Sequence, residues 1–194
     1  MKKINLRTNK NNVLNDVYLI TPEVFSDNRG FFLESWNEFI FNENIRSTNF
    51  CQDNHSYSSR GVLRGIHYQL NPHSQGKLVR CTRGCIYDVA VDLRKYSDTY
   101  KEWVGIELSE VNKKLLWIPE GFGHGFLTQS ESAEVQYKVT NSWNKNSEKT
   151  IIWDDPDLKI DWPLSQLNIK KPLFSEKDGN GLTLESAEKY NFLF

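Results

Sequence analysis

The stretch Lys77–Arg94, KLVRCTRGCIYDVAVDLR, carries the clearest β-strand pattern in this sequence. Apolar residues recur at short intervals on both sides of Arg83-Gly84, a dipeptide typical of a turn. The pattern predicts two successive strands, over residues 78–82 and 85–93. Asp88 and Asp92 lie among the aliphatic residues of the second strand.

The rest of the chain repeats this pattern on both sides. Further β-prone runs cover residues 13–20, 30–36, 99–108, 115–119, 121–128, 133–140 and 150–153. Many short strands with glycine turns between them predict an all-β, cupin-like jelly-roll sandwich or barrel. Short helices are expected at 37–45 and 182–190, on the periphery. Residues 1–194 then form one jelly-roll domain with a loose N-terminal arm, residues 1–12, and a C-terminal extension.

The bulk properties exclude some classes of function. The 24 basic and 25 acidic residues nearly cancel, and the isoelectric point is ≈ 6.4, whereas a general nucleic-acid binder carries a basic face. No apolar run approaches the roughly 18 residues of a membrane span. The charged residues at 1–5 are not followed by the apolar segment of a signal peptide. We therefore expect a cytoplasmic protein that binds neither nucleic acid nor membrane.

The cysteines give no sign of a disulfide framework or of a zinc site. Their number is odd, and no C-x-x-C motif occurs among Cys51, Cys81 and Cys85. We interpret them as small buried residues.

Residues 50–69, FCQDNHSYSSRGVLRGIHYQ, are too polar for a core strand. In strict alternation Leu63, Gly65, His67 and Gln69 share one face, and Arg64, Ile66 and Tyr68 share the other. A histidine and an amide on an inward face are costly unless they are paired or used. This stretch is therefore the first candidate for the lining of a site.

A metal is not expected. A metal-binding cupin would carry two histidines two residues apart, but the matching position here reads His67-Tyr68-Gln69. Residues 119–124, PEGFGH, do have the look of the second cupin motif. Half of a ligand set indicates a jelly roll without its metal, and we interpret His124 as a structural histidine.

His67 can act as a general base, because the pKa of a histidine lies near neutral pH. It needs an acceptor on its other ring nitrogen, and the residues alone leave several carboxylates open for this role: Asp27, Asp53, Asp88, Asp92 and Asp178.

Three kinds of side chain could meet an anionic substrate or complete the acid–base set. Lys77 opens a strand, where a cation could stabilise an anionic oxygen; a solvated strand end is the alternative. Tyr137 shares a face with Val135 and Val139, so it could equally be a core ring. Arg29 and Arg64 each adjoin a glycine, which lets a phosphate approach the guanidinium closely.

A series of segments, in order from about residue 13 to 180, makes the pattern much more specific. They are Phe25–Glu34, Gln52–Ser56, Val62–Gln69, Gly76–Arg80, Asp88–Arg94, Ile118–Phe126, Tyr137–Lys138, Trp153–Asp155, Asp161–Pro163 and Ser175–Asp178. Together these segments resemble the dTDP-4-dehydrorhamnose 3,5-epimerase family.

The resemblance implies a β jelly roll that forms a homodimer and needs no metal or other cofactor. The substrate would be the nucleotide sugar dTDP-4-dehydro-6-deoxy-D-glucose, inverted at C3 and C5 on the way to dTDP-L-rhamnose. By matching motif, the base would be His67, its orienting carboxylate Asp178, the enolate-stabilising cation Lys77 and the proton donor Tyr137. Arg29 and Arg64 would bind the diphosphate. The pocket, partly across the dimer interface, would include Phe25, Glu34, Gln52, Asn54, Phe126 and Trp143.

The chemistry suits these residue types. A 4-keto group acidifies the hydrogens on C3 and C5, because the carbanion is an enolate that a cation stabilises. Inversion needs a base on one face of the sugar and an acid on the other. No hydride moves, and no G-x-G-x-x-G motif follows a strand.

Two points stay open from the sequence. Ser142 stands where the family often carries a ring to stack on the thymine, although Trp143 keeps one aromatic, so the identity of the base is not settled. The same set could also serve an epimerase of C3 only or of C5 only. A non-catalytic cupin-like binder of nucleotide sugars and a metal-dependent cupin oxygenase are the alternatives from other classes.

Overall fold

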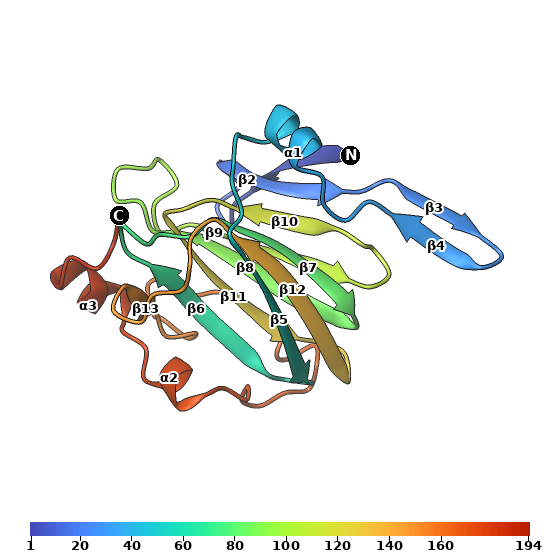
Figure 1. Ribbon diagram of the computed structural model, residues 1–194. Helices are drawn as coiled ribbons and strands as arrows, with labels where there is room; N and C mark the ends of the chain where they lie inside the picture. The colour runs from blue at the N-terminus through green and yellow to red at the C-terminus, as the bar shows by residue number, and fades with distance from the viewer.

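The computed structural model describes residues 1–194 as two packed antiparallel sheets, a separate two-stranded hairpin and three short helices (Figure 1). The strands are β1 (Lys2–Arg7), β2 (Val13–Thr21), β3 (Val24–Asp27), β4 (Gly30–Leu33), β5 (Gln52–Ser59), β6 (Leu63–Gln69), β7 (Lys77–Arg83), β8 (Cys85–Asp92), β9 (Trp103–Ser109), β10 (Leu115–Ile118), β11 (Phe122–Thr128), β12 (Ser132–Val139) and β13 (Glu148–Thr150). The helices are α1 (Glu38–Asn44), α2 (Glu176–Gly179) and α3 (Leu184–Lys189). None of them has the length and apolar character needed to cross a membrane.

The order of the strands confirms the predicted jelly-roll sandwich. One sheet has six strands in the order β1-β2-β10-β7-β12-β5, and the other has five in the order β13-β6-β11-β8-β9. The chain passes from one sheet to the other between β5 and β6, between β6 and β7, and between β7 and β8. Residues far apart in sequence therefore face one another across the space between the sheets.

Alternation along the central strands builds the core between the sheets. On β8, Ile86 and Ala90 belong to an inner cluster of 16 buried residues, whereas Val89 and Val91 belong to a second cluster on the outer face. Asp88 lies between Ile86 and Ala90 on the same inner face, and it is fully buried. A strand with apolar side chains on both faces is buried on both.

Two further layers cover the outer faces of the sheets. The segment that follows β13, residues 151–194, includes α3 and adds Trp162 and Leu184 to the cluster outside the five-stranded sheet. Helix α1 places Phe41 against Trp117 outside the six-stranded sheet, with ring centroids 5.3 Å apart. Asn37 caps this helix by accepting a hydrogen bond from the backbone N–H of Ile40.

The prediction that residues 1–12 form a loose arm is wrong. Strand β1 pairs with β2 in antiparallel register from Lys2↔Thr21 to Arg7↔Val13, and Leu6 is buried in the inner core. The alternation is hard to see in a polar sequence, because only Ile4 and Leu6 are apolar within β1.

The other predicted elements differ from the structure mainly at their ends. Of the run 30–36, only 30–33 is a strand, and the run 99–108 becomes a strand at Trp103. Residues 97–99 are instead held in a turn, in which the hydroxyls of Ser97 and Thr99 donate to the carboxylate of Asp92. The interpretation of the cysteines holds for buried Cys81, whereas Cys85 is half-buried and Cys51 is exposed.

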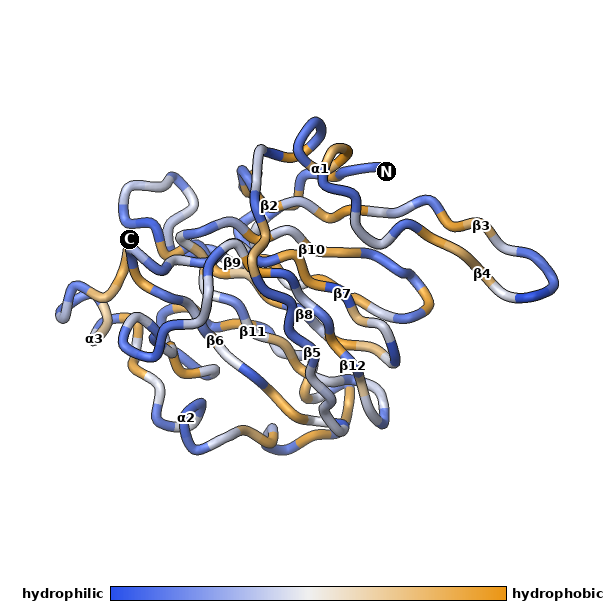
Figure 2. Tube along the Cα trace, viewed as in Figure 1, coloured by the Kyte–Doolittle hydropathy of each residue, from blue (hydrophilic) through white to orange (hydrophobic).

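The hairpin β3–β4 extends from the body of the molecule (Figure 1). Its strands are apolar and its tip is hydrophilic (Figure 2). Phe25, Phe31 and Phe32 are 57%, 60% and 69% exposed, which is unusual for large apolar side chains that lie together.

An irregularity in β6 changes which side chains face inward. Arg64 pairs with Phe126, and His67 pairs with His124. Residues 65 and 66 of β6 therefore both stand opposite the single residue Gly125, which is a β-bulge. Leu63, Ile66 and Tyr68 all belong to the outer cluster. The prediction that Arg64 faces away from His67 is therefore wrong, because this bulge adds one residue to the alternation between them.

Gly65 permits the bulge. Its φ is +113°, and a Cβ at this position would lie 2.5 Å from the Cα of Gly125 and 2.5 Å from the carbonyl oxygen of His124. We expect Gly65→Ala to lower the free energy of unfolding by about 2–4 kcal/mol, from the strained backbone and the clash together. Urea denaturation measures this.

Gly30→Ala is the matched control for that substitution. Gly30 also has a positive φ, +129°, but no atom lies within 4 Å of the position of its Cβ. Gly30→Ala should therefore lower the free energy of unfolding only through the strained backbone, by about 1–2 kcal/mol. If the two variants lose equal free energy of unfolding, the clash between β6 and β11 does not contribute to the loss in Gly65→Ala.

Candidate active site

A cavity of about 340 Å³ opens between the two sheets, and polar side chains form most of its wall. It is lined by Gln52, Asn54, His67, Tyr68, Gln69, Gln75, Lys77, Tyr137, Trp143 and Glu148. Strands β5, β7 and β12 contribute one wall from the six-stranded sheet, and β6 and β13 contribute the other from the five-stranded sheet. The cavity collects six of the residues predicted for the site, from segments far apart in the chain.

His67 and Asp178 form a hydrogen-bonded pair at this cavity. The Nε2 atom of His67 bonds to Oδ1 of Asp178, which lies 111 residues further along the chain. Burial lowers the pKa of His67 below its usual value, although the bond to Asp178 and its charge act in the opposite direction. His67 is therefore neutral at pH 7. Because a carboxylate can only accept, Nε2 carries the proton and Nδ1 is the basic atom.

Helix α2 holds the carboxylate of Asp178 in place. The hydroxyl of Ser175 accepts from the backbone N–H of Asp178 and donates to its Oδ2, at 3.2 and 2.8 Å. Lys177 pairs with Glu148 of β13 at 2.9 Å, which ties α2 to the sheet. Burial would raise the pKa of Asp178, but its contacts with His67 and Ser175 keep that pKa below the usual value. Asp178 is thus an ionised acceptor for His67.

Lys77 is a buried cation in the opposite wall. It is 7% exposed, and its ammonium donates to the backbone carbonyl of His67 at 3.3 Å. Burial lowers the pKa of Lys77 to about 8. The group is therefore mostly charged at pH 7 but poorly solvated, which suits it to binding an anionic oxygen.

Tyr137 faces the same space from β12. It packs against the inner core, and its alternation with Val135 directs both side chains inward. Burial raises the pKa of Tyr137, while the charge of Arg64 partly offsets this. The hydroxyl is therefore protonated and can donate a proton.

Three polar side chains extend the site along β5 and β6. Arg64 donates to the hydroxyl of Ser58 at 3.0 Å and to the carbonyl of Tyr57 at 3.2 Å, so it bridges the two sheets. Gln52 donates to Asn54 at 2.8 Å, and both side chains line the cavity.

Comparison with known proteins identifies the family. The family model described as dTDP-4-dehydrorhamnose 3,5-epimerase matches residues 11–186. The dTDP-4-dehydrorhamnose 3,5-epimerase of Pseudomonas aeruginosa is 53% identical over 174 residues, which are 89% of this chain and 93% of that protein. The chain belongs to the dTDP-4-dehydrorhamnose 3,5-epimerase family.

Two other members of this epimerase family bear on the substrate. The crystal structure of dTDP-6-deoxy-D-glucose-3,5-epimerase RmlC from Legionella pneumophila, in complex with dTDP-4-keto-L-rhamnose, superposes with a TM-score of 0.90 at 39% identity, covering 99% of this chain and 96% of that one. The dTDP-4-dehydrorhamnose 3-epimerase of Streptomyces niveus is 39% identical over 178 residues, 91% of this chain and 84% of that protein.

Six of the residues predicted for this family's site do not line the cavity. Asp178 contacts it through His67, and Arg64 lies further along β6; the other four lie elsewhere. Phe126 is 3% exposed and belongs to the inner core. Phe25, Arg29 and Glu34 lie on the hairpin or next to it, and all three are exposed. Arg29 pairs with Asp27 within the hairpin turn at 2.6 Å. Within one chain, the structure does not bring these three residues to His67.

Two polar residues of this site, Glu148 and Gln69, are absent from the predicted set of catalytic and substrate-binding residues. Glu148 lines the cavity, and its pairing with Lys177 helps to keep its pKa below the usual value against the effect of burial. Gln69 donates to two backbone carbonyls and is 2% exposed. Alternation along residues 63–69 places Gln69 on the face of His67 without giving it a role, and no local pattern distinguishes Glu148.

Trp143 and Ser142 lie at the rim of this cavity. Trp143 is 56% exposed, and its backbone N–H donates to the side chain of Gln52 at 3.3 Å. Ser142 lies beside Cys51, with oxygen and sulfur 3.9 Å apart. A half-exposed aromatic ring at the rim of a cavity can stack on a planar ligand.

No group of three or more histidine, cysteine, aspartate or glutamate side chains in the structure could hold a metal ion. His124, of the cupin-like motif, bonds instead through Nε2 to Asp88 at 2.8 Å, and both side chains are buried.

Proposed function

We propose that this protein inverts C3 and C5 of dTDP-4-dehydro-6-deoxy-D-glucose to give dTDP-4-dehydro-L-rhamnose. One observation carries the proposal: a neutral histidine with an orienting carboxylate and a protonated tyrosine meet at one cavity from opposite sheets. A base and an acid on opposite walls can act on opposite faces of a sugar that lies between them, which is what inversion requires. The name of the family and the ligand in the Legionella structure support the choice of substrate.

His67 is the base in this proposal. Its Nδ1 removes the hydrogen from C3 or C5, which the neighbouring C4 ketone acidifies. The imidazolium that forms is stabilised by Asp178, whose bond to Nε2 also fixes the orientation of the ring. Because its pKa is lowered, His67 stays neutral, and can accept a proton, at pH values low enough to charge an ordinary histidine.

Lys77 stabilises the intermediate. When the proton leaves, negative charge moves to the C4 oxygen, and the enolate is favoured by a cation in a site with little water. Tyr137 then delivers a proton to the other face of the carbon. Arg64, Gln52 and Asn54 bind the diphosphate and nucleotide end of the substrate, and Trp143 stacks on the base.

Incubation of the sugar nucleotide with the protein in deuterium oxide tests the activity. We expect deuterium at both C3 and C5 of the product, since each inversion removes a carbon-bound hydrogen and returns a proton from solvent. Proton NMR of the product counts the labelled carbons.

The outcome also separates the alternatives. Label at C3 alone would make the protein a 3-epimerase, a possibility supported by its 39% identity to the Streptomyces niveus enzyme. Binding without any label would leave only a non-catalytic binder of nucleotide sugars and would contradict the proposal.

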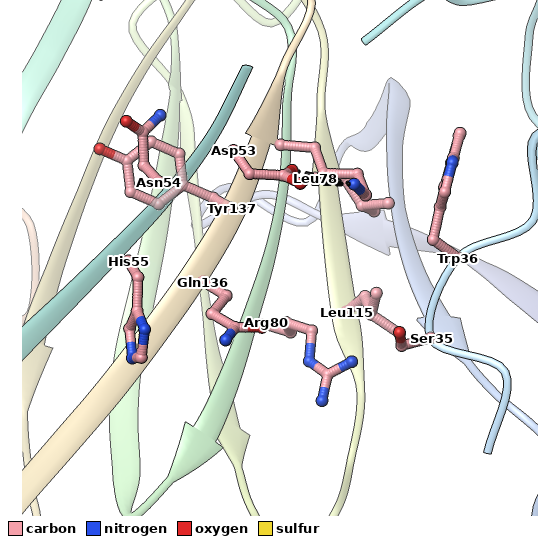
Figure 3. Close-up of a pocket in the computed structure, with 11 residues that line it drawn as sticks. Ser35, Trp36, Asp53, Asn54, His55, Leu78, Arg80, Leu115, Gln136 and Tyr137 are labelled. Atoms are coloured by element: carbon pink, nitrogen blue, oxygen red, sulfur yellow. Dashed lines mark hydrogen bonds and ion pairs between the residues drawn. The ribbon is translucent and has the colours of Figure 1, made fainter. Parts of the chain in front are cut away.

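We also propose a homodimer in which the hairpin of one chain reaches the other. The exposed phenylalanines of β3 and β4 form an apolar surface that water disfavours. A groove of about 320 Å³ lies on the outer face of the six-stranded sheet, between Trp36 and the residues Leu78, Arg80 and Leu115 (Figure 3). Strand β5 forms an edge of that sheet and pairs only with β12, so its other side has unpaired backbone groups that a strand of the partner chain could meet. In such a dimer, Phe25, Arg29 and Glu34 enter the partner's cavity, which explains their absence from their own.

Mixing two inactive variants tests this arrangement. We expect Arg29→Ala and His67→Ala dimers each to be strongly impaired. If Arg29 serves the partner's site, a dimer of one chain of each kind contains one site with both native residues. Co-refolded mixtures should regain up to about a quarter of the wild-type activity, from random pairing in a symmetric dimer. No recovery, or a monomer in analytical ultracentrifugation, would contradict it.

A cytoplasmic location is the remaining part of the proposal. All three cysteines are free, as is usual in a reducing compartment. Cell fractionation tests it, and recovery of the protein outside the cytoplasmic fraction would count against it.

A further inference from the structure

We propose that Asp88 is a positioning residue for this reaction, whose buried negative charge keeps Lys77 protonated and fixes the ring of His124. Asp88 has no place in the acid–base scheme above and does not line the cavity. The inference rests on the proposed enolate chemistry, because that chemistry is what requires Lys77 to be charged.

Asp88 is an unusual residue for the interior of a sandwich. It is 0% exposed and lies between Ile86 and Ala90 on the inner face of β8. Its Oδ1 accepts from Nε2 of His124 at 2.8 Å, and its Oδ2 is buried without any hydrogen-bond partner. A buried carboxylate that is only half satisfied is costly. Hydrophobic packing therefore does not account for it.

Lys77 is a buried cation that lacks a direct counter-ion. No carboxylate oxygen lies within 4.0 Å of its ammonium, which bonds only to the carbonyl of His67. The charged and titratable groups around it come from five elements: His67 and Tyr68 of β6, Asp88 of β8, Tyr137 of β12, Glu148 of β13 and Lys177 of α2. Of the two carboxylates, Glu148 is already paired with Lys177 at 2.9 Å. Asp88 bonds to His124 through one oxygen only, and its second oxygen has no partner, so we assign to Asp88 the negative charge that balances Lys77.

The energetic balance at Lys77 makes this charge important. Burial lowers the pKa of Lys77 to about 8, and the charges of Asp88 and Glu148 act against this lowering. The pKa already lies close to neutral pH, so a small further decrease would leave much of Lys77 uncharged. A neutral lysine carries no charge to stabilise an enolate. The kcat of the proposed reaction would therefore fall with rising pH as Lys77 loses its proton.

His124 connects this pair to the catalytic base. It stands directly opposite His67 in the register of β11 and β6. Since a carboxylate can only accept, Nε2 of His124 carries a proton in this bond. His124 is also the only donor to the Asp88 side chain, so its loss would leave the buried carboxylate with no hydrogen bond to stabilise its negative charge.

The test measures the protonation of Lys77 directly in the full-length chain. The protein is labelled with [ε-13C]lysine, the Lys77 signal is assigned with a Lys77→Arg variant, and its pH titration is followed by NMR. We expect Asp88→Asn to shift the midpoint down by about one pH unit. The alkaline decline of kcat should move by the same amount, so that kcat well above the wild-type midpoint falls about tenfold while KM changes little.

Asp92→Asn is the matched control. Asp92 is equally buried on the same strand, but it is held by Arg94, Ser97 and Thr99. It should leave the midpoint of Lys77 unchanged. His124→Leu is the second variant in case Asp88→Asn does not fold, and it should shift the midpoint in the same direction.

An unchanged Lys77 midpoint in whichever of the two variants folds would overturn the inference. This outcome is distinct from failure of the proposed function. If wild-type protein exchanges no deuterium, the epimerase proposal fails, but the NMR titration still reports whether Asp88 controls the charge of Lys77.

Discussion

Replacing His67 by alanine is expected to lower kcat by about 10²-fold or more, which is the usual loss when a general base is removed. The physical reason is specific to this site. No other neutral imidazole lines the cavity, and the hydrogens on C3 and C5 are too weakly acidic for water to remove quickly. Steady-state assays and the rate of deuterium exchange should fall together, because both depend on the same proton removal.

A double substitution shows whether His67 and Asp178 act as a unit. Asp178→Ala alone should also reduce kcat, because His67 loses the acceptor that fixes its ring. The double variant should be no slower than His67→Ala, since Asp178 has nothing to orient once the imidazole is gone. His73→Ala is the control for loss of a histidine. His73 bonds to Ser147 and does not line the cavity, and a similar loss there would mean that His67 has no special role.

Replacing Tyr137 by phenylalanine should separate proton removal from inversion. The ring still packs against the inner core, but the hydroxyl is lost, so the opposite wall has no donor for the second proton. Formation of the inverted product should fall by about 10²-fold or more. His67 can still remove a proton and return one from solvent to the same face. Deuterium should therefore enter the starting sugar faster than product appears.

The ratio of exchange to product formation is the measurement that decides the role of Tyr137. A general loss of stability would lower both rates equally and leave the ratio unchanged. Tyr96→Phe is the control, because Tyr96 is 100% exposed and distant from the cavity in the fold. If Tyr137→Phe lowers exchange and product formation in parallel, then Tyr137 is not the proton donor.

The core could be predicted from the sequence because alternation is a local property. The Lys77–Arg94 stretch shows both of its strands without any knowledge of their partners. Its inner residues Val79, Ile86 and Ala90 all belong to the core between the sheets. The same reasoning singled out residues 63–69, because His67 and Gln69 interrupt an inward face.

Local alternation also produced the errors. Strict alternation places Arg64 on the face opposite His67, and only the pairing with β11 reveals the bulge that brings both to one side. The sequence predicts a loose arm over residues 1–12, because their few apolar residues give little signal. Leu6 is buried only because β2 lies beside it.

The sequence by itself determined the all-β class, the chemical types available to the site and, through resemblance, the family. The tertiary structure decided which carboxylate meets His67, since five were open and only Asp178 on α2 reaches it. It also decided that Lys77 and Tyr137 stand across the cavity from His67, and that Arg29 does not reach this cavity in its own chain. The reason is physical: side-chain type and alternation are encoded residue by residue, whereas the meeting of distant groups depends on sheet order, register and bulges.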